Sequence, residues 1–591
     1  MRPPAQPKPK IMEVDVLVVG GGGAGAFAGI AAAKAGASVV VAVKGKIGRS
    51  GATPTAGADF MADARSVIEI LGRPEGDRRD SPDEFMLDIV KQGQYLNNQE
   101  LVELYVNEAP YRIQELIDWG MTITHIENAH NSCFPRGVMT TGPDIGRALR
   151  RGVRENKIPL LEDMFVVDLL SNGSRVIGAV GLDQRTGVPY LLKAGAVVLA
   201  TGGWQALYPW TSATEDLTGD GQAMAYRAGA DLMDMEMVQF LPGIVIDPPA
   251  WRRSIYLYAL PAGTLFNRFG EAFLQRCNPQ MVNSPLSYWP KETTAIAIKL
   301  EVLEGRGSPS GGVYFSLRHL PKNLVDNLAA EAATGQWKSD RLDIEALFSY
   351  LKAGNSVEVT SDAAHFSTGG IRIDRNCAAT VPGLFAAGEC TAGTWGAGRV
   401  CSALTEMTVQ GHVAGIQAAR FAAGSDRAEP YPDQVIKVLD TLCGPLERLS
   451  GTSPIAIRQQ LQKLAGSRVG VVRTNALLSE AIDSLKQLRL ILDDLATVSK
   501  TQRYNREWFE ALQLRNMINV LDISAHSARM RTESRGCHFR GDFPVIDNDH
   551  WLVNITARQR GNALEITTSP IAVTKIPLPQ GILPYKQFSQ S

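Results

Sequence analysis

The chain has 591 residues, with 60 Lys and Arg against 61 Asp and Glu, a formal net charge of -1 and 45% hydrophobic residues. This balance gives no reason to expect nucleic acid or an anionic membrane surface as a general partner, and no run approaches the roughly 20 apolar residues of a membrane-spanning helix. We therefore expect a globular protein without direct membrane insertion, and several domains, since one domain usually holds about 100–200 residues.

The N-terminus, MRPPAQPKPKIME, is Pro-rich and basic and has no apolar stretch of the kind that a secretory signal requires. We expect it to be a loose tail. The seven cysteines are scattered and form no CxxC pair. This spacing argues against a disulfide framework, a zinc site or an iron–sulfur cluster bound by this chain, so we predict no metal site and a cytoplasmic location.

The first predicted elements form a complete strand–helix–strand unit. VDVLVV (14–19) reads as a strand buried on both faces, an alanine-rich helix follows and ends at Gly36, and SVVVAV (38–43) is a second strand. The turn between them carries GxGxxG, which permits a tight turn and close approach of a pyrophosphate to the helix N-terminus. We predict a dinucleotide site whose backbone contacts come from the glycine turn: Gly20, Gly22, Gly23, Ala24 and Gly25.

The acidic residue that usually ends the second strand and holds a ribose is absent, because Val43 and Lys44 stand there. Either another residue holds the ribose, or the dinucleotide lies differently. We include Lys44 among the cofactor contacts. NAD and FAD share the glycine fingerprint, so later segments must decide between them.

The segment IGRSGATPTAGADF (47–60) is rich in small and hydroxyl residues and can aim backbone N–H groups at a flat ring. Further on, AVVLATGG and TGDGQAMAYRAGA predict a buried strand followed by the start of a helix. Both segments favour FAD. The cofactor contacts predicted from them are Ser50, Gly51, Ala52, Gly57, Thr201, Gly202 and Asp220.

The third segment that favours FAD runs from Val381 to Gly415. A strand ends at Gly388-Glu389, and after a Gly-rich loop a helix begins near Ser402. The N-terminus of a helix can stabilise negative charge on a reduced isoalloxazine. We predict Glu389 as a ribose ligand and Ser402 and Leu404 as further cofactor contacts.

The order and spacing of these segments resemble the succinate dehydrogenase/fumarate reductase flavoprotein family, whose relatives include L-aspartate oxidase and the adenylylsulfate reductase flavoprotein subunit. Two further segments carry the resemblance, HFSTGGIRID (365–374) and RTESRGCHFRGDFP (531–544). The likeness extends from about Val14 to about Trp551. GEC, GAGR, H-x-x-x-GG and ESRG-x-H-x-R occur in the family's order, which makes the resemblance specific.

The resemblance implies an α/β fold with a Rossmann-like FAD-binding domain, an inserted α+β capping domain, a C-terminal helical domain and a tail. The implied boundaries are 12–240 plus 355–425, 241–354, 430–540 and 541–591. Helical periodicity independently predicts helices within 476–498 and 505–530, and WLVNIT and ALEITT alternate like strands. We expect the tail to wrap the body or to contact a partner.

In this family a hydride moves between flavin N5 and a substrate carbon that lies beside carboxylates. Arg399, in GAGR, can bind a carboxylate with two parallel hydrogen bonds, although it could instead pair with an acid of the core. His365 is placed to hydrogen-bond the substrate, and its alternative is a satisfied loop histidine. We predict both as catalytic residues.

Three positions depart from the fumarate-active pattern. Arg49-Ser50 is followed by Gly51 where the family has the histidine that links FAD covalently, so we predict non-covalent FAD, with a lower flavin potential that favours substrate reduction. A substrate-binding histidine in V-Q-x-H-P is Leu241 here. The closest counterpart of the catalytic arginine is Lys291, in Pro-Lys-Glu, which we predict to be a proton donor; its alternative is a surface charge.

The sequence therefore predicts an FAD-dependent oxidoreductase acting on a small unsaturated or saturated carboxylate other than fumarate, with electrons delivered by a separate iron–sulfur partner. An adenylylsulfate-reductase-like subunit with flavin–sulfite chemistry is an alternative: RSGA (49–52) favours it and the segment around Phe266 and Arg276 does not. A non-catalytic flavin-binding assembly subunit is another. The cluster Arg535, His538 and Arg540 fits either a surface near the partner or a salt-bridged helix end.

Overall fold

The computed structural model describes residues 8–57, 59–128, 132–173, 175–252, 254–255, 259–274, 291–334, 343–399 and 401–585. Arg276, which bears on the sulfur-chemistry alternative, lies outside these residues. Every residue predicted above as a catalytic or cofactor contact lies within them.

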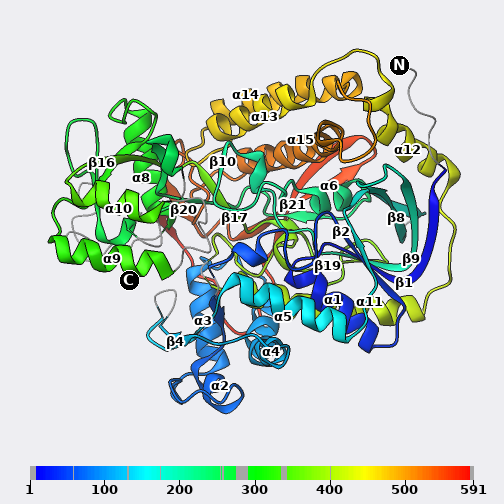
Figure 1. The fold of residues 1–591 in the computed structure, drawn as a ribbon, viewed down its shortest axis with the longest axis horizontal. Helices are drawn as coiled ribbons and strands as arrows, with labels where there is room; N and C mark the ends of the chain where they lie inside the picture. Colours follow the sequence, from blue (N-terminus) through cyan, green and yellow to red (C-terminus); the bar gives the residue numbers. More distant parts are fainter. Residues whose placement is uncertain are drawn as a thin grey trace.

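A seven-stranded sheet lies in the right-hand part of Figure 1. β1 (Lys10–Val19) pairs in parallel on both sides, and its last four residues are at most 5% exposed, which explains why they are all apolar. The strand order is β6-β2-β1-β9-β8-β7, with β19 also on β9. The bounds are β2 Val39–Val43, β6 Leu160–Glu162, β7 Met164–Asn172, β8 Arg175–Asp183, β9 Pro189–Leu199 and β19 Leu384–Ala386.

Two helices that are far apart in the sequence cross closely beside this sheet. α1 (Gly23–Lys34) contacts α11 (Ala403–Ala423), and Figure 1 shows both below the sheet. A Cβ at Gly411 would lie 2.4 Å from the carbonyl oxygen of Ala24. Glycine is therefore required for this crossing, and the crossing brings the glycine turn near the start of α11.

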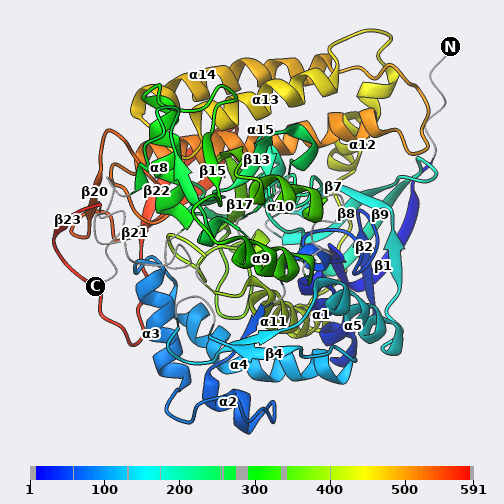
Figure 2. The same ribbon diagram turned by 60° about the vertical axis from the view of Figure 1, so that its left-hand side comes forward.

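Residues between β13 and β16 form a second layer with its own hydrophobic core, which includes Leu265, Phe315 and Leu347. Its sheet has the order β13-β16-β15-β14, and it lies at the left of Figure 1 and at the front of Figure 2. The predicted boundaries of a capping domain remain a prediction. The bounds are β13 Ile244–Asp247, β14 Thr264–Phe266, β15 Val313–Ser316, β16 Ser356–Thr360, α8 Lys291–Leu303, α9 Lys322–Thr334 and α10 Ile344–Lys352.

Long helices cross the top of the molecule in both views (Figures 1 and 2). The two helices expected from periodicity are confirmed as α14 (Asn475–Ile491) and α15 (Arg506–Met530). α15 is buried along most of its length, because it packs against α13, α14 and α6. The other helices here are α12 Pro432–Glu447 and α13 Pro454–Arg468, and α6 is Asp220–Arg227.

The C-terminal segment wraps the body. β21 (Val553–Arg560) and β22 (Ala563–Pro570) form a hairpin at WLVNIT and ALEITT, as the alternation predicted. β21 also pairs with β11 (Leu232–Met233), so residues more than 300 positions apart share a sheet of order β18-β11-β21-β22. β18 is Gly370–Ile371, and the ribbon β20-β23 consists of Val545–Asp547 and Ile582–Pro584.

Smaller elements complete the molecule around the predicted site. The three-stranded sheet β10-β17-β12 contains Trp210–Thr211, Ala363–Ser367 and Val238–Leu241. The sheet β3-β5-β4 contains Asp59–Met61, Gly137–Met139 and His125–Glu127, and the helices beside it are α2 Ala64–Glu69, α3 Pro82–Gln92, α4 Gln99–Asp118 and α5 Gly142–Glu155. Within the described part of the chain, no helix combines the length and apolarity needed to cross a membrane.

Candidate active site

The glycine turn packs so closely against neighbouring backbone that Gly20 has no room for a side chain. Gly20 has φ +121°, and a Cβ there would lie 2.1 Å from the carbonyl oxygen of Ala200. Gly22 caps α1 without a side-chain bond, and the first turn of α1 contains no acidic residue. The start of α1 therefore presents backbone N–H groups and a partial positive charge, which fits a diphosphate.

Two of the predicted cofactor contacts, Lys44 and Asp220, come together at the far side of this turn. The Lys44 ammonium donates to Asp220 Oδ2 at 2.8 Å and to Thr218 Oγ1 at 3.1 Å. Asn516 donates to the other oxygen of Asp220 at 2.8 Å. The carboxylate that is missing after β2 is thus present near the same place, at the start of α6.

The loop between β2 and β3 carries the predicted contacts Ser50, Gly51, Ala52 and Gly57. Ser50 Oγ donates to the carbonyl of Lys46 at 2.8 Å, which folds the loop on itself. Within the described residues, a Cβ at Gly51 would meet no atom closer than 4 Å. The loop therefore leaves open space at the position where covalent members of the family carry the linking histidine.

Glu389 lies between β17 and the end of β9. It accepts hydrogen bonds from the backbone N–H of Ser367 at 3.1 Å and from the side-chain amide of Gln205. Burial raises the pKa of Glu389 to about 7. A carboxyl group that titrates near neutrality can donate or accept a hydrogen bond, as contact with a ribityl or ribose hydroxyl requires.

The start of α11 lies where the sequence predicted it. Ser402 caps the helix, accepting a hydrogen bond from the N–H of Thr405 at 3.3 Å, and its hydroxyl donates to the carbonyl of Asp59. Leu404 is buried beneath this turn. The acidic residue in the first turn of α11 is Glu406, and burial raises its pKa to about 7. This end of the helix can therefore face an anion.

Buried polar atoms without a hydrogen-bond partner among the described residues occur in many parts of the chain, and five of them belong to residues in or beside the predicted site. Buried polar groups are nearly always paired, so this group of atoms points to a polar molecule that belongs between them. The residues lie between the end of β9 and Arg399, along the predicted path of FAD, and FAD carries the hydroxyl and carbonyl groups that fit them. The atoms are Thr201 Oγ1, Gln205 Oε1, Gln222 Oε1, Gln239 Oε1 and Arg399 Nε.

The structure brings the two predicted catalytic residues into direct contact. Arg399 Nη2 lies 2.9 Å from His365 Nε2, and Ser212 Oγ lies 2.8 Å from His365 Nδ1. Because a guanidinium only donates, Nε2 accepts and the imidazole proton sits on Nδ1, where it is donated to Ser212. His365 is therefore held as a neutral imidazole of fixed orientation.

The Arg399 guanidinium is held over the Phe366 ring, 5.0 Å from its centroid, and donates to the carbonyl of Cys401 at 3.3 Å. Among the residues that the structure describes, Arg399 makes no ion pair with a carboxylate, so the alternative of a partner acid in the core receives no support. The guanidinium keeps donors for an incoming carboxylate.

Lys291 is the first residue of α8 and lies close enough to Arg399 for their charges to interact. Burial, followed by the positive charge of Arg399, lowers the pKa of Lys291 to about 8, while Glu292 and Asp59 oppose the shift. The side chain is therefore not an ordinary surface lysine. It is mostly protonated at neutral pH and gives up its proton more readily than an exposed lysine does.

Gln239 ties the start of α8 to the Arg399 loop. Its amide donates to the carboxylate of Glu292 and to the carbonyl of Arg399, the latter at 3.0 Å. Leu241, two residues further along β12, is 4% exposed and pairs with Ala363 of β17. The position where the family has a histidine is therefore an apolar, buried position here.

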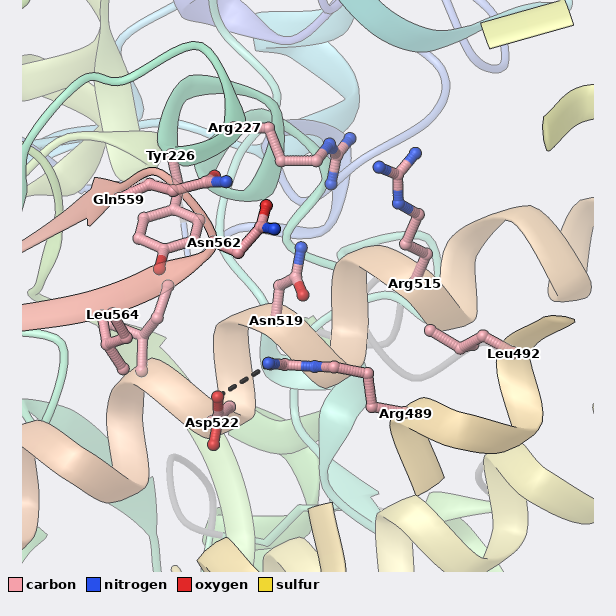
Figure 3. Close-up of a pocket in the computed structure, with 11 residues that line it drawn as sticks. Tyr226, Arg227, Arg489, Leu492, Arg515, Asn519, Asp522, Gln559, Asn562 and Leu564 are labelled. Carbon is pink, nitrogen blue, oxygen red and sulfur yellow. Dashed lines mark hydrogen bonds and ion pairs between the residues drawn. The ribbon is translucent and has the colours of Figure 1, made fainter. Parts of the chain in front are cut away.

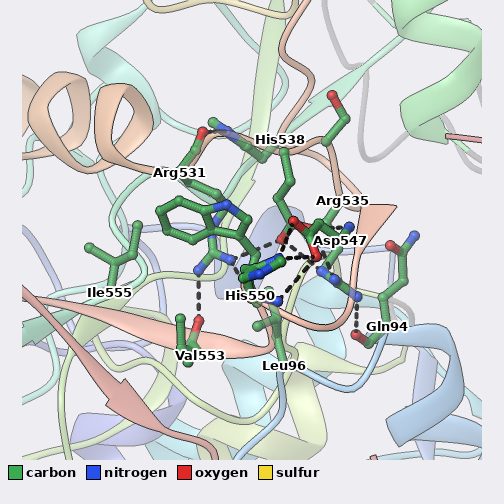
Figure 4. Close-up of polar contacts among 12 residues, drawn as sticks. Gln94, Leu96, Arg531, Arg535, His538, Asp547, His550, Val553 and Ile555 are labelled. Carbon is green, nitrogen blue, oxygen red and sulfur yellow. Dashed lines mark hydrogen bonds and ion pairs between the residues drawn. The ribbon is translucent and has the colours of Figure 1, made fainter. Parts of the chain in front are cut away.

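The C-terminal basic cluster is buried rather than displayed on a surface, and Figure 4 shows Arg535 and His538 among their neighbours. Arg535, His538 and Arg540 are at most 1% exposed. Arg535 pairs with Glu533 at 2.9 Å, and Arg540 pairs with Asp542 at 2.8 Å. The salt-bridged alternative is therefore correct. Burial and three neighbouring arginines lower the pKa of His538 well below its usual value, so this histidine is neutral.

The segment that carries this cluster also hydrogen-bonds to the loop that contains Arg399. The N–H of Cys537 donates to the carbonyl of Ala397 at 2.8 Å, two residues before Arg399. The hydroxyl of Tyr585, from the C-terminal segment, donates to the carbonyl of Gly536 at 2.7 Å. Sequence reasoning missed Ser212, Gln239, Glu292 and Tyr585. Gln239 and Glu292 lie inside the segments that drew attention to Leu241 and Lys291, but no sequence signal marks Ser212 or Tyr585.

Comparisons with known proteins agree with this geometry. Residues 15–404 match the family model described as an FAD binding domain, and residues 458–585 match the one described as fumarate reductase flavoprotein C-term. The chain is 33% identical over 518 residues to a fumarate reductase (CoM/CoB) subunit of Methanothermobacter marburgensis, covering 85% of this chain and 90% of that protein.

Two solved structures show the same fold over nearly the whole length. The Sdh1 complex of Mycobacterium smegmatis with UQ1 matches with a TM-score of 0.84 and 29% identity, covering 96% of each chain. The quinol fumarate reductase of Escherichia coli matches with a TM-score of 0.82 and 26% identity, covering 97% of this chain and 99% of that one.

Proposed function

Because the chain belongs to the fumarate reductase/succinate dehydrogenase flavoprotein family of FAD-dependent oxidoreductases, we propose that it transfers a hydride between flavin N5 and a small carboxylate other than fumarate. The observation that carries the proposal is the meeting of three groups from separate elements. These are Arg399 from the loop before α11, His365 from β17, and Lys291 from the start of α8.

In this proposal Arg399 binds and orients the substrate. A guanidinium that has no carboxylate partner among the described residues can take a substrate carboxylate in a bidentate arrangement. Stacking on Phe366 and the bond to the Cys401 carbonyl hold the guanidinium in place. His365, oriented by Ser212, fixes the position of Arg399 and lies beside the same carboxylate. Orientation of this kind lowers the barrier because the reacting carbon is held in place before the reaction.

Lys291 is the proposed proton donor in the reductive direction. Bound FAD supplies the hydride at N5, and saturating a carbon–carbon double bond also requires a proton on the neighbouring carbon. A lysine with a pKa of about 8 is protonated at pH 7 and transfers its proton more easily than an unperturbed lysine. Glu292 and Gln239 hold the start of α8 against the Arg399 loop and so fix the donor.

Two residues support a substrate that differs from fumarate. Lys291 stands where the family has an arginine, and an ammonium group cannot bind a second carboxylate in the bidentate way. Leu241 is a buried apolar side chain at a position where the family has a substrate-binding histidine. Both changes remove donors for a second carboxylate, so we propose a substrate with one carboxylate near Arg399 and a less polar far end.

We further propose that electrons reach the flavin through a separate iron–sulfur protein. The cysteines of this chain are scattered and form no cluster-binding pattern. The names of the relatives support a multi-protein assembly, since the proteins of Methanothermobacter marburgensis and Mycobacterium tuberculosis are both named as subunits of a fumarate reductase.

Reoxidation of the reduced holoenzyme tests this function. Dithionite-reduced protein is mixed anaerobically with fumarate, crotonate, mesaconate and cinnamate, and the return of oxidised flavin absorbance is followed. We expect crotonate or cinnamate, which carry one carboxylate, to give a higher kcat/KM than the dicarboxylates fumarate and mesaconate, and Arg399→Gln to lower that value at least roughly 100-fold. A panel in which fumarate or mesaconate has the highest kcat/KM would contradict the proposed substrate class.

The same preparation tests the sulfur-chemistry alternative. Sulfite is added to the oxidised holoenzyme, and the flavin absorbance is recorded. We expect no loss of absorbance, since an enzyme that reduces the carbon–carbon double bond of an unsaturated acid does not need to form a flavin–sulfite adduct. Bleaching at low sulfite concentration, together with no reoxidation by any acid, would favour the alternative instead.

A further inference from the structure

A second pocket, of about 230 Å³, opens between helices α6, α14 and α15 and the β21–β22 hairpin (Figure 3). None of the residues that line the pocket is a predicted catalytic residue or cofactor contact. The residues used in the argument are Arg227, Arg489, Arg515, Asn519 and Gln559.

Two of the three arginines are already paired. Arg227 Nε lies 2.9 Å from Asp168 Oδ2 and its Nη2 lies 3.1 Å from Oδ1, which is a bidentate arrangement. Arg489 donates to Asp522 at 2.7 Å, and Asp522 is also 3.3 Å from the ring of His526. The two acids beside the pocket are therefore engaged by these partners.

Arg515 is different. It makes no hydrogen bond with any residue in the described ranges, and its ion partner there is Asp168 at 3.6 Å, which Arg227 already holds. Burial and then the charge of Arg227 lower the pKa of Arg515, while Asp168 and, more weakly, Asp493 oppose the shift. The Arg515 side chain is 34% exposed, so its guanidinium is open to a ligand, and the donors that it does not use within the described residues can bind an anion.

Amide groups provide the rest of the polar lining. Gln559 donates from Nε2 to the carbonyl of Gly561 at 2.9 Å, and its Oε1 is buried with no partner among the described residues. In Figure 3 the amide of Asn519 lies between Arg227 above and Arg489 below, with Asn562 on its left and Arg515 on its right. Gln559 Oε1 needs a hydrogen-bond donor, and the amide of Asn519 can both donate and accept. A hydroxyl group can bond to both, so the site suits a ligand that carries one.

We propose that this pocket binds a small hydroxylated oxyanion, either a carboxylate or a phosphate, with its anionic group on Arg515 and its hydroxyl on Gln559 and Asn519. Arginine presents a planar pair of donors that matches both kinds of oxyanion. The volume is below the roughly 300–1,000 Å³ of pockets for drug-sized ligands. The ligand is therefore a small metabolite rather than a nucleotide.

Titration calorimetry on the FAD-loaded protein tests the site with three anionic probes, inorganic phosphate, L-malate and glycerol 3-phosphate, and with glycerol as the neutral probe. We expect at least one hydroxylated anion to bind and glycerol not to bind. Arg515→Gln should weaken binding at least roughly ten-fold, because it removes charge-assisted hydrogen bonds. Arg515→Lys keeps the positive charge but loses the planar pair of donors, so its affinity should lie between those of the unmodified protein and Arg515→Gln.

Two control variants separate this site from other binding. Arg506→Gln makes the same chemical change on the same helix at an exposed position outside the pocket and should bind as the unmodified protein does. Arg399→Gln alters the proposed active site and should leave binding at Arg515 unchanged. The proposal is overturned if neither L-malate nor glycerol 3-phosphate binds, if Arg515→Gln retains full affinity, or if Arg506→Gln weakens binding equally.

Discussion

The ionisation of one lysine decides the direction of proton transfer in the proposed reaction. Lys291 has its pKa lowered to about 8 because it is partly buried and lies near the positive charge of Arg399. The ammonium form is the donor, so reductive turnover should be constant at pH 6–7 and fall as the pH rises through about 8. The opposite direction, oxidation of the saturated acid, needs the neutral amine and should rise through the same pH.

Substitution of Lys291 tests this role. We expect Lys291→Met to lower reductive kcat by roughly 10²–10⁴-fold, the usual contribution of a general acid. Lys291→Arg keeps a positive charge that does not titrate in this range, so its residual activity should not fall near pH 8. Steady-state rates measured between pH 6 and 10 give both results. An unchanged pH profile in Lys291→Arg would assign the transition near pH 8 to another group.

A buried carboxyl group predicts how stability depends on pH. Glu406 is 3% exposed, accepts a hydrogen bond from the Trp395 indole at 2.7 Å, and has its pKa raised by burial to about 7 from 4.5. Between pH 4.5 and 7 the folded protein binds more protons at this group than the unfolded chain does. The stability that it contributes is therefore full below pH 4.5 and is lost as the pH rises through 7, by about 3 kcal/mol.

Glu406→Gln tests that dependence, because an amide does not titrate. At pH 5 the glutamic acid is protonated and resembles glutamine, whereas at pH 8 the native side chain is a buried anion. The melting temperature of the variant relative to the native protein should therefore be higher at pH 8 than at pH 5. Calorimetric melting of both proteins at the two pH values measures this difference, and a difference independent of pH would contradict the raised pKa.

The sequence identified Arg399, His365 and Lys291 because each lies in or beside a motif of the family. It could not identify Ser212 or Gln239 as their partners. Ser212 reaches His365 because β10 pairs with β17, and Gln239 reaches Arg399 because β12 pairs with the other side of β17. Pairings between distant strands depend on the whole fold, and the residues carry no local pattern that reveals them.

Among the elements, the crossing of α1 and α11 connects the diphosphate end of the predicted site with its flavin end. The helices approach so closely that Gly411 faces the backbone of Ala24. An added methyl group must push the helices apart, and overpacking of this kind costs about 1–3 kcal/mol. The displacement also moves the start of α11 away from the cofactor.

Gly411→Ala should therefore lower both the melting temperature and the FAD content of the purified protein. Gly424→Ala is a matched control at the end of the same helix, where a Cβ would have no atom closer than 3.8 Å and φ is -93°. We expect the control to retain the FAD content and melting temperature of the native protein. Equal losses in both variants would show that the crossing has no special role.

Elements with strong local sequence patterns were predictable, but which elements pair with one another was not. β1, α1 and β2 follow from valine runs around a glycine turn, and α14 and α15 follow from apolar residues at helical spacing. The pairing of β21 with β11 joins residues more than 300 positions apart. The basic cluster of Arg535, His538 and Arg540 remained ambiguous in the sequence, because its burial depends on distant residues: Arg535 donates to the carbonyl of Gln94, more than 400 positions earlier.

At the scale of the whole molecule, the proposed active site is shared between two layers. Lys291 and Glu292 belong to the layer that contains the second hydrophobic core, while Arg399 and His365 belong to the body that contains the glycine turn. The site is complete when both layers meet, and Gln239 bridges them through Glu292 and the Arg399 carbonyl.

The attachment of FAD is a property of the whole protein that the sequence predicts directly. Gly51 follows Arg49-Ser50, and a glycine has no side chain that can form a bond to the flavin. Acid precipitation of the yellow holoenzyme should therefore release all of its FAD into the supernatant, with none left on the pellet. Flavin fluorescence of both fractions measures this. Flavin that remains with the denatured chain would reveal a covalent link at another residue.

The central claim is that a substrate carboxylate lies on Arg399, beside His365 and within reach of Lys291, next to the flavin. A crystal structure of the FAD holoenzyme with benzoate, an unreactive monocarboxylate, tests it most directly. We predict FAD with its diphosphate at the start of α1, and the benzoate carboxylate on Arg399 with Lys291 facing it. Benzoate bound elsewhere, or an Arg399 side chain turned away from the flavin, would contradict the account.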